Sequence, residues 1–143
     1  MNFAICRDDL LWLAGVIDGE GTITYVKKTN RGVGTIYIYY YPELSIMNPD
    51  VEYLKTIQKA IGSGNIYIQK QHKTYLYTLL SSKLVLFSIQ VLPFLRREYQ
   101  RLRMIIASEY ENGNPVKNKE LYLSIRRITV QMGGSSIYVK HNE

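Results

Sequence analysis

The segment from Leu13 to Gly21 constrains this chain more than any other. It reads LAGVIDGEG and joins an apolar helix of small residues to an acidic end. Gly15 and Gly19 stand four residues apart, on one side of a helix, where a second helix can approach the backbone closely. Asp18 and Glu20 follow at the helix end, where carboxylates beside glycine can reach a metal ion. The segment therefore predicts a helix that pairs with another helix and ends in acid.

The composition limits the class of protein. The 143 residues, 46% of them hydrophobic, predict one domain over residues 1–143 with a sizeable core. The single cysteine, Cys6, excludes an intrachain disulfide and a cysteine metal cluster, and two histidines argue against structural zinc. A net charge of +6 and a pI near 9.4 suit a nucleic-acid partner without requiring one.

The sequence also bears on location. No apolar run approaches the roughly 18 residues of a membrane-spanning helix, and the N-terminus lacks the layout of a signal peptide. We therefore expect a protein of the cytoplasm or an organelle interior, not secreted and without a membrane partner.

Hydrophobic periodicity and turn residues predict a helix–strand–strand–helix–strand–strand–helix–helix order and then a C-terminal helix. Asp8 is the expected cap of the first helix and Asn48 that of the second, while Pro42 is expected to mark an edge or a bulge. The order predicts an α+β fold in which a four-stranded, mostly antiparallel sheet carries helices on one face. The expected helices are about 9–18, 49–61, 83–91, 93–110 and 118–131, and the expected strands are 22–28, 35–47, 65–71 and 74–80.

Alternation along the strands sorts their side chains onto two faces. Apolar residues such as Leu44 and Ile46 are expected to face the helices, with Ile66, Ile68, Leu76 and Leu80. The other face can fit the major groove of DNA and read base edges there, although a solvated sheet face has much the same pattern. Its expected residues are Thr24, Val26, Lys28, Tyr37, Tyr39, Tyr41, Glu43, Ser45, Tyr67, Gln69, Gln71, Tyr75 and Tyr77.

The segment Leu13–Gly21 resembles the signature of the LAGLIDADG homing endonucleases. Val16 replaces a larger apolar residue, and Glu20 stands where that family has Asp or Glu. The element order over about residues 9–110 resembles the family's αββαββα core, whose saddle-shaped antiparallel sheet straddles DNA, and about 116–143 would add a C-terminal helix and tail. Because the signature occurs once, the chain resembles the branch that acts as homodimers. The resemblance implies a dimer interface on the motif helix, formed by Leu13, Gly15, Val16 and Gly19.

The resemblance also implies roles in a metal site. Glu20, the last acid of the signature, is the expected ligand of catalytic Mg²⁺ (or Mn²⁺), together with a backbone carbonyl of Gly19. Two such carboxylates at a dimer axis would repel each other unless cations neutralised them. Asp18 is expected to have a structural, capping role instead.

Two further positions follow from the same resemblance. A polar residue that orders water at the end of the second strand corresponds to Asn48, for which a capping role alone is an equal alternative. A basic residue that contacts the phosphate corresponds to Arg97, with Arg96 and Arg101 as alternatives.

The sequence is therefore compared with three classes of function by what each would require of it. The first is an intron-encoded, Mg²⁺-dependent homing endonuclease that hydrolyses both strands of a long, near-palindromic double-stranded DNA site as a homodimer. The second is an RNA maturase, with its own intron RNA as partner, or a non-cleaving DNA-binding regulator of the same fold. The third is a plain α+β interaction protein. The presence of the acid Glu20 favours the enzyme.

Overall fold

The elements follow one another in the predicted order. The structure, a computed structural model, describes residues 4–131, so the tail with Gly133 and Gly134 lies outside the described residues. No helix of this range is long and apolar enough to cross a membrane. The elements are α1 (Arg7–Glu20), β1 (Gly21–Gly32), β2 (Thr35–Asn48), α2 (Val51–Ile61), β3 (Asn65–Gln69), the 3-10 turn η1 (Lys70–His72), β4 (Thr74–Leu80), α3 (Ser81–Val91), the 3-10 turn η2 (Leu92–Phe94), α4 (Glu98–Ser108) and α5 (Pro115–Gln131).

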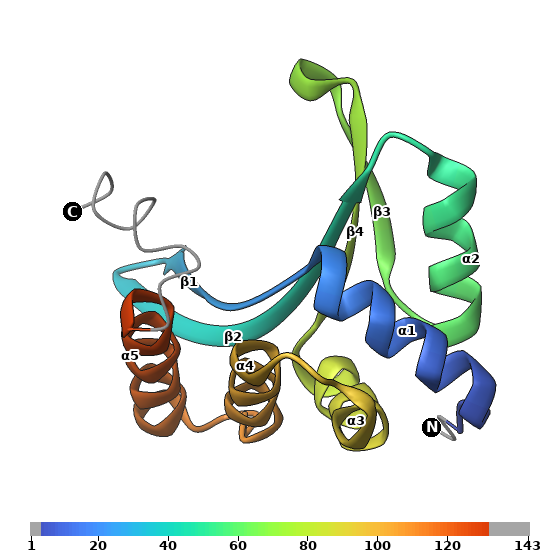
Figure 1. Cartoon of the computed structure of the whole chain (residues 1–143). Helices are drawn as coiled ribbons and strands as arrows, with labels where there is room; N and C mark the ends of the chain where they lie inside the picture. Colours follow the sequence, from blue (N-terminus) through green and yellow to red (C-terminus); the bar gives the residue numbers. More distant parts are fainter. Residues whose placement is uncertain (1–3, 132–143) are drawn as a thin grey trace.

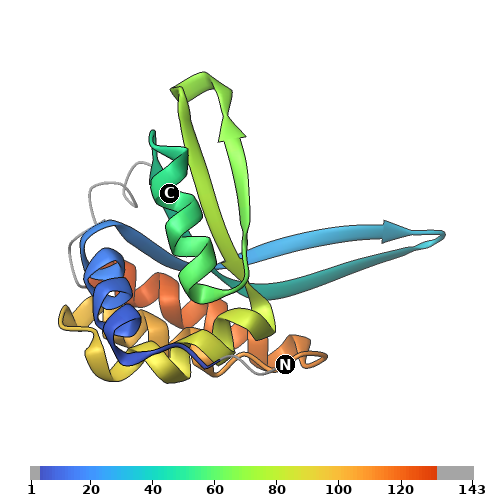
Figure 2. The same ribbon diagram turned by 90° about the vertical axis from the view of Figure 1, so that its right-hand side faces the viewer.

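The four strands form one antiparallel sheet in the order β1-β2-β4-β3. The helices lie on one side of it, with α3, α4 and α5 beneath the β1–β2 part and α2 beside β3 and β4 (Figure 1). The hairpins β1–β2 and β3–β4 diverge from each other, so the sheet is saddle-shaped and its concave face carries no helix (Figure 2). The α+β fold, the antiparallel sheet and the helices on one face are confirmed.

Pro42 lies in the part of β2 that pairs with β1 alone, so β2 is an edge strand there. The register of β1 against β2 runs without a bulge, and Pro42 stands opposite Tyr25. Strand β4 pairs with β2 only from Glu43 onward. One side of β2 is therefore unpaired at Pro42, where a residue without an N–H is tolerated.

The core lies between the sheet and the helices. The α1 stripe of Leu10, Leu13, Ala14 and Ile17 packs toward the inward side chains of the strands. Three tyrosines belong to this core, and each is less than a tenth exposed: Tyr25, Tyr40 and Tyr77. The Tyr25 hydroxyl donates a hydrogen bond to the Ile106 carbonyl at 2.9 Å, which satisfies its polar end inside the protein.

The predicted faces of β4 are wrong. Tyr77 is fully buried, because Ile46 and Ile66 of the neighbouring strands stand opposite it on the helix side. Its ring packs against Gly64, whose φ of +108° is one that few residues other than glycine adopt, and its hydroxyl donates to the Ser63 carbonyl at 2.7 Å. Tyr75, on the same side, is half-buried, whereas Leu76 and Leu80 belong to the concave face.

Several predicted helix ends also differ. Helix α1 begins at Arg7 rather than after Asp8, which lies in its first turn, and continues through Glu20. Asp50, not Asn48, caps α2, since its side chain accepts from two backbone amides there. The long helix predicted from Pro93 is divided into η2, an extended link and α4, which starts at Glu98.

Candidate active site and DNA-binding face

The candidate active site lies at the end of α1. Glu20 is exposed there, and its carboxylate Oε2 accepts a hydrogen bond from the Tyr53 hydroxyl of α2 at 3.1 Å. The Tyr53 ring meets the Trp12 ring of α1 edge to face, with centroids 6.3 Å apart. Burial and this carboxylate together raise the pKa of the Tyr53 hydroxyl. Glu20 is thus an accessible carboxylate with one fixed partner.

Asp18 joins the end of α1 to the chain before α4. Its carboxylate accepts hydrogen bonds from the backbone amides of Arg96 at 2.8 Å and of Arg97 at 3.3 Å. Both oxygens are therefore engaged with the protein. These contacts are those of a structural residue, as predicted for Asp18.

Gln100 makes a second link between α4 and the end of α1. Its side-chain amide donates to the Ile17 carbonyl at 2.8 Å and to the Gly21 carbonyl at 2.7 Å, and the side chain is only 1% exposed. The Gly21 amide also donates to the Ile17 carbonyl, so Gln100 adds a second donor there and gives the Gly21 carbonyl a side-chain donor at the turn from α1 into β1. In the sequence Gln100 only locates its basic neighbours, and no local pattern marks it as a partner of α1.

Arg97 stands beside the same helix end. Its guanidinium Nη1 donates to the backbone carbonyl of Asp18 at 3.1 Å and lies over the Tyr99 ring at 4.5 Å. The side chain is exposed and remains within reach of a ligand above the end of α1. Arg96 and Arg101 are exposed too, and within the described residues neither side chain has a hydrogen bond or an ion pair.

Asn48 lies at the end of β2, close to the end of α1, because Gly21, which directly follows α1, pairs with Ile46. Its side-chain oxygen accepts from the backbone N–H of Asp50 at 2.8 Å. The residue thus forms a turn ahead of α2 rather than capping that helix.

The exposed face of α1 differs in part from the predicted dimer interface. Gly15 and Gly19 are exposed, and a Cβ atom added to either would meet no heavy atom of the rest of the chain within 4 Å. Leu13 is fully buried and Val16 only 8% exposed, so placing these two in an interface was wrong. Two residues advance a helix by about 200°, which puts Leu13 opposite Gly15. The apolar residues that accompany the glycines on the exposed face are Leu11 and Trp12.

The oxygen donors of a single chain form only part of a site for a hard cation. Among residues 4–131 no group of three acidic, histidine or cysteine side chains could enclose a metal ion. Glu20 offers oxygen donors, and the carbonyl end of α1 adds a negative potential. Mg²⁺ is typically held by one or two carboxylates together with substrate phosphates, so an incomplete, all-oxygen site suits it.

The concave face carries most of the side chains predicted to meet DNA. Tyr37, Tyr39 and Tyr67 are 59%, 37% and 49% exposed there. Gln71 is exposed but belongs to the turn η1 rather than to a strand. The remaining residues of the predicted set that the register places on this face are Thr24, Val26, Lys28, Tyr41, Ser45 and Gln69.

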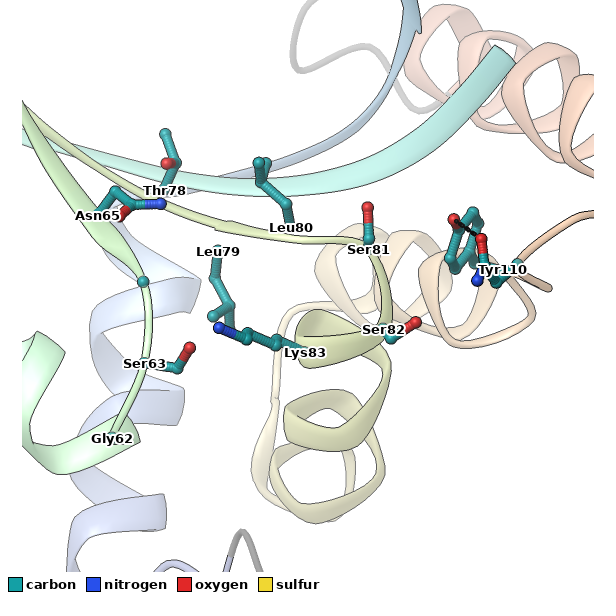
Figure 3. A pocket seen from close by; sticks show the side chains of 12 residues that line it. Gly62, Ser63, Asn65, Thr78, Leu79, Leu80, Ser81, Ser82, Lys83 and Tyr110 are labelled. Carbon is teal, nitrogen blue, oxygen red and sulfur yellow. Dashed lines mark hydrogen bonds between the residues drawn. The ribbon is translucent and has the colours of Figure 1, made fainter. Parts of the chain in front are cut away.

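A separate cavity lies where β3 begins and β4 runs into α3. It has a volume of about 680 Å³, and its lining includes Ser63, Ser82, Lys83 and Tyr110. Figure 3 shows the Lys83 side chain extending from α3 into the space beside the Gly62–Ser63 turn. None of the predicted site residues lines this cavity, so it is distinct from the end of α1.

Comparisons with solved structures agree with this fold. The homing endonuclease I-CvuI, in complex with its target, shares 17% sequence identity with this chain and superposes with a TM-score of 0.70. The match covers 90% of this chain and 87% of the I-CvuI chain. The archaeal intron-encoded homing endonuclease I-Vdi141I, complexed with DNA, shares 22% identity over 85% of this chain and 84% of its own, with a TM-score of 0.64. Among curated protein sequences, no match was found.

The sequence itself decides the family. The model of the LAGLIDADG endonuclease family matches residues 13–96, which is more than half of the chain. This range runs from the motif helix through the sheet to the link that Asp18 holds. The chain therefore belongs to the LAGLIDADG endonuclease family.

Proposed function

We propose that this protein is a site-specific double-strand DNA endonuclease that acts as a homodimer with Mg²⁺. The observation that carries the proposal is the position of Glu20. It is an exposed carboxylate at the end of the helix whose Gly15–Gly19 side is bare. A close approach of two α1 helices through these glycines would bring two Glu20 carboxylates together.

The dimer explains why one chain holds an incomplete metal site. Two adjacent carboxylates repel each other, and divalent cations between them and the DNA phosphates relieve that repulsion. A bound Mg²⁺ supplies an activated water and stabilises the leaving oxygen in phosphodiester hydrolysis. Glu20 would hold the cation, with a carbonyl of Gly19 as a further candidate ligand.

The protein's own residues would position the phosphate. Arg97 would place a positive charge beside the scissile group, and Asp18 fixes the backbone on which Arg97 stands. Asn48, at the neighbouring strand end, would orient water through its side-chain amide group, whose oxygen is engaged with Asp50. Side chains of the concave face would contact base edges, and surrounding Lys and Arg the phosphates.

Selection of cleavable sites from a randomised duplex library, with Mg²⁺, tests the proposal. We expect one long, near-palindromic site to be cut by the unmodified protein. Glu20→Gln should bind that site and lose cleavage by more than about a hundred-fold, because a metal ligand is removed. Glu120→Gln, which neutralises an exposed carboxylate on α5, is the matched control and should cut normally.

Three other outcomes would contradict parts of the proposal. Cleavage retained by Glu20→Gln would assign the cation to another carboxylate. Binding of DNA without cleavage by a folded, dimeric protein would indicate a regulator of the same fold. Absence of DNA binding would exclude the endonuclease, and RNA of the host intron would then be the ligand to test for maturase function.

A further inference from the structure

The concave face contains one acidic side chain among its described strand residues. The register places hydroxyl, amide, aromatic and apolar side chains across this face, and Lys28 adds a positive charge. Glu43 is the exception. Because DNA phosphates are anionic, a carboxylate on a surface that meets DNA lowers affinity for every sequence. Its presence there calls for a compensating contact that depends on sequence.

Glu43 has a central position on this face. It lies on β2, opposite Thr24 of β1 and Leu80 of β4, in the first row where three strands stand side by side. The side chain is half-buried, and within the described residues it has neither an ion pair nor a hydrogen bond. Both carboxylate oxygens are thus available to a donor that arrives from the open side of the sheet.

We propose that Glu43 is a specificity residue that accepts a hydrogen bond from the exocyclic amino group of a cytosine. A carboxylate is an acceptor only, and in the major groove the amino group of cytosine is a donor that acidic side chains contact. Adenine also presents an amino donor, but its N7 acceptor stands beside that donor and repels a carboxylate. Guanine and thymine present acceptors at the same place.

This inference rests on the proposed function and adds a feature of the substrate. In a homodimer each Glu43 meets one half-site, so the preferred cytosine occurs at the same distance from the centre in both halves. The recognised DNA should therefore contain one symmetric pair of positions at which cytosine is favoured by about five- to a hundred-fold.

Parallel site selections with the unmodified protein and Glu43→Gln test it, with base preference scored at every position. Glutamine offers both a donor and an acceptor, which match adenine. We expect Glu43→Gln to lose the cytosine preference at one symmetric pair, to favour adenine there, and to keep its other preferences. Glu120→Gln, equal in charge change but on α5, should leave every position unchanged.

The outcomes distinguish a failure of the base assignment from a failure of the endonuclease proposal. If Glu43→Gln cuts the same sequences with the same preferences, Glu43 reads no base, while the endonuclease proposal stands. If the altered position favours a base other than cytosine in the unmodified protein, the assignment to cytosine is wrong. If neither protein selects any duplex, the endonuclease proposal itself fails, and the inference fails with it.

Discussion

The Tyr53 hydroxyl donates a hydrogen bond to the Glu20 carboxylate across 3.1 Å, and so α2 holds a side chain that belongs to the end of α1. An exposed glutamate at a helix end otherwise samples several rotamers. The bond to Tyr53, which the Trp12 ring supports from the side, restricts Glu20 before any ligand binds. Partners of this kind orient metal ligands in other metal sites.

Removing this hydroxyl should slow cleavage without weakening DNA binding. We expect Tyr53→Phe to lower the cleavage rate by about ten- to a hundred-fold, the usual effect of losing a group that orients a metal ligand. Cleavage rates measured across a Mg²⁺ titration, beside DNA affinity, check this. Tyr122→Phe on α5 is the control, and an unchanged rate in Tyr53→Phe would show that Glu20 needs no such restraint.

Arg97→Ala should impair cleavage more than binding. Alanine keeps the backbone amide that Asp18 binds and removes only the guanidinium. A charge-assisted hydrogen bond contributes about 1.5–3 kcal/mol, so we expect a fall in rate of about ten- to a hundred-fold. Single-turnover cleavage at saturating protein measures it. Arg96→Ala and Arg101→Ala run in parallel, and a larger effect in either would move the role to that residue.

A large side chain at Gly15 should separate the two subunits. The site is open in the single chain, and leucine suits a helix better than glycine by about 1 kcal/mol, so Gly15→Leu should fold well. Sedimentation at micromolar concentration should show a dimer for the unmodified protein and a monomer for the variant. Lys119→Leu, an apolar addition on α5, should remain dimeric. A dimeric Gly15→Leu protein would place the interface elsewhere.

Gln100→Leu should destabilise the fold. The substitution removes both bonds to the carbonyls of Ile17 and Gly21 while keeping a side chain of similar size. The Ile17 carbonyl keeps the Gly21 amide as a donor, whereas the Gly21 carbonyl loses its side-chain donor. A buried group left without a partner costs about 1–3 kcal/mol, and denaturant unfolding would detect a loss of that size. Gln58→Leu, which removes one bond to the Gly64 carbonyl in a less buried place, should cost less. An equal loss of unfolding free energy in the two variants would show that Gln100 stabilises the fold no more than Gln58 does.

The stability of Glu43→Gln should depend on pH. Burial raises the pKa of Glu43, so the folded state favours its protonated form. The stabilising effect of that proton is complete below about pH 4, the range of an unperturbed glutamate, and is lost as the pH rises through the folded-state pKa. Glu43→Gln should therefore melt at a higher temperature than the unmodified protein at pH 7 and at the same temperature in acid. A constant difference across pH would exclude ionisation as the cause.

The sequence predicted the order of elements because each helix and strand has a clear period and a turn at its ends. It failed on the faces of β4, where Tyr75, Tyr77, Leu76 and Leu80 are all apolar enough for a core. Packing decides between the two choices, since only Tyr77 meets the space left by Gly64 and a carbonyl for its hydroxyl. The neighbouring strands determine which face of β4 is buried, and the residue pattern of β4 alone gives no information about those neighbours.

In the candidate site, too, the sequence predicts some residues and not others. Glu20 and the glycine pair follow from one continuous motif, and Asp18 from its position in that motif. Tyr53 and Gln100 reach the end of α1 from segments 33 and 79 or more residues away. Nothing local distinguishes them from ordinary helix residues. The motif predicts a single interface face, but neighbouring positions of a helix point to different sides, so Leu13 and Val16 face inward while the glycines face out.

The Asp18 carboxylate binds the backbone amides of Arg96 and Arg97, and not their side chains. Every amino acid except proline provides such an amide, so the bonds that this carboxylate makes between α1 and the chain before α4 are independent of which side chains stand at 96 and 97. These two positions are therefore free to diverge during evolution toward new phosphate contacts, while the carboxylate that supports them has to stay.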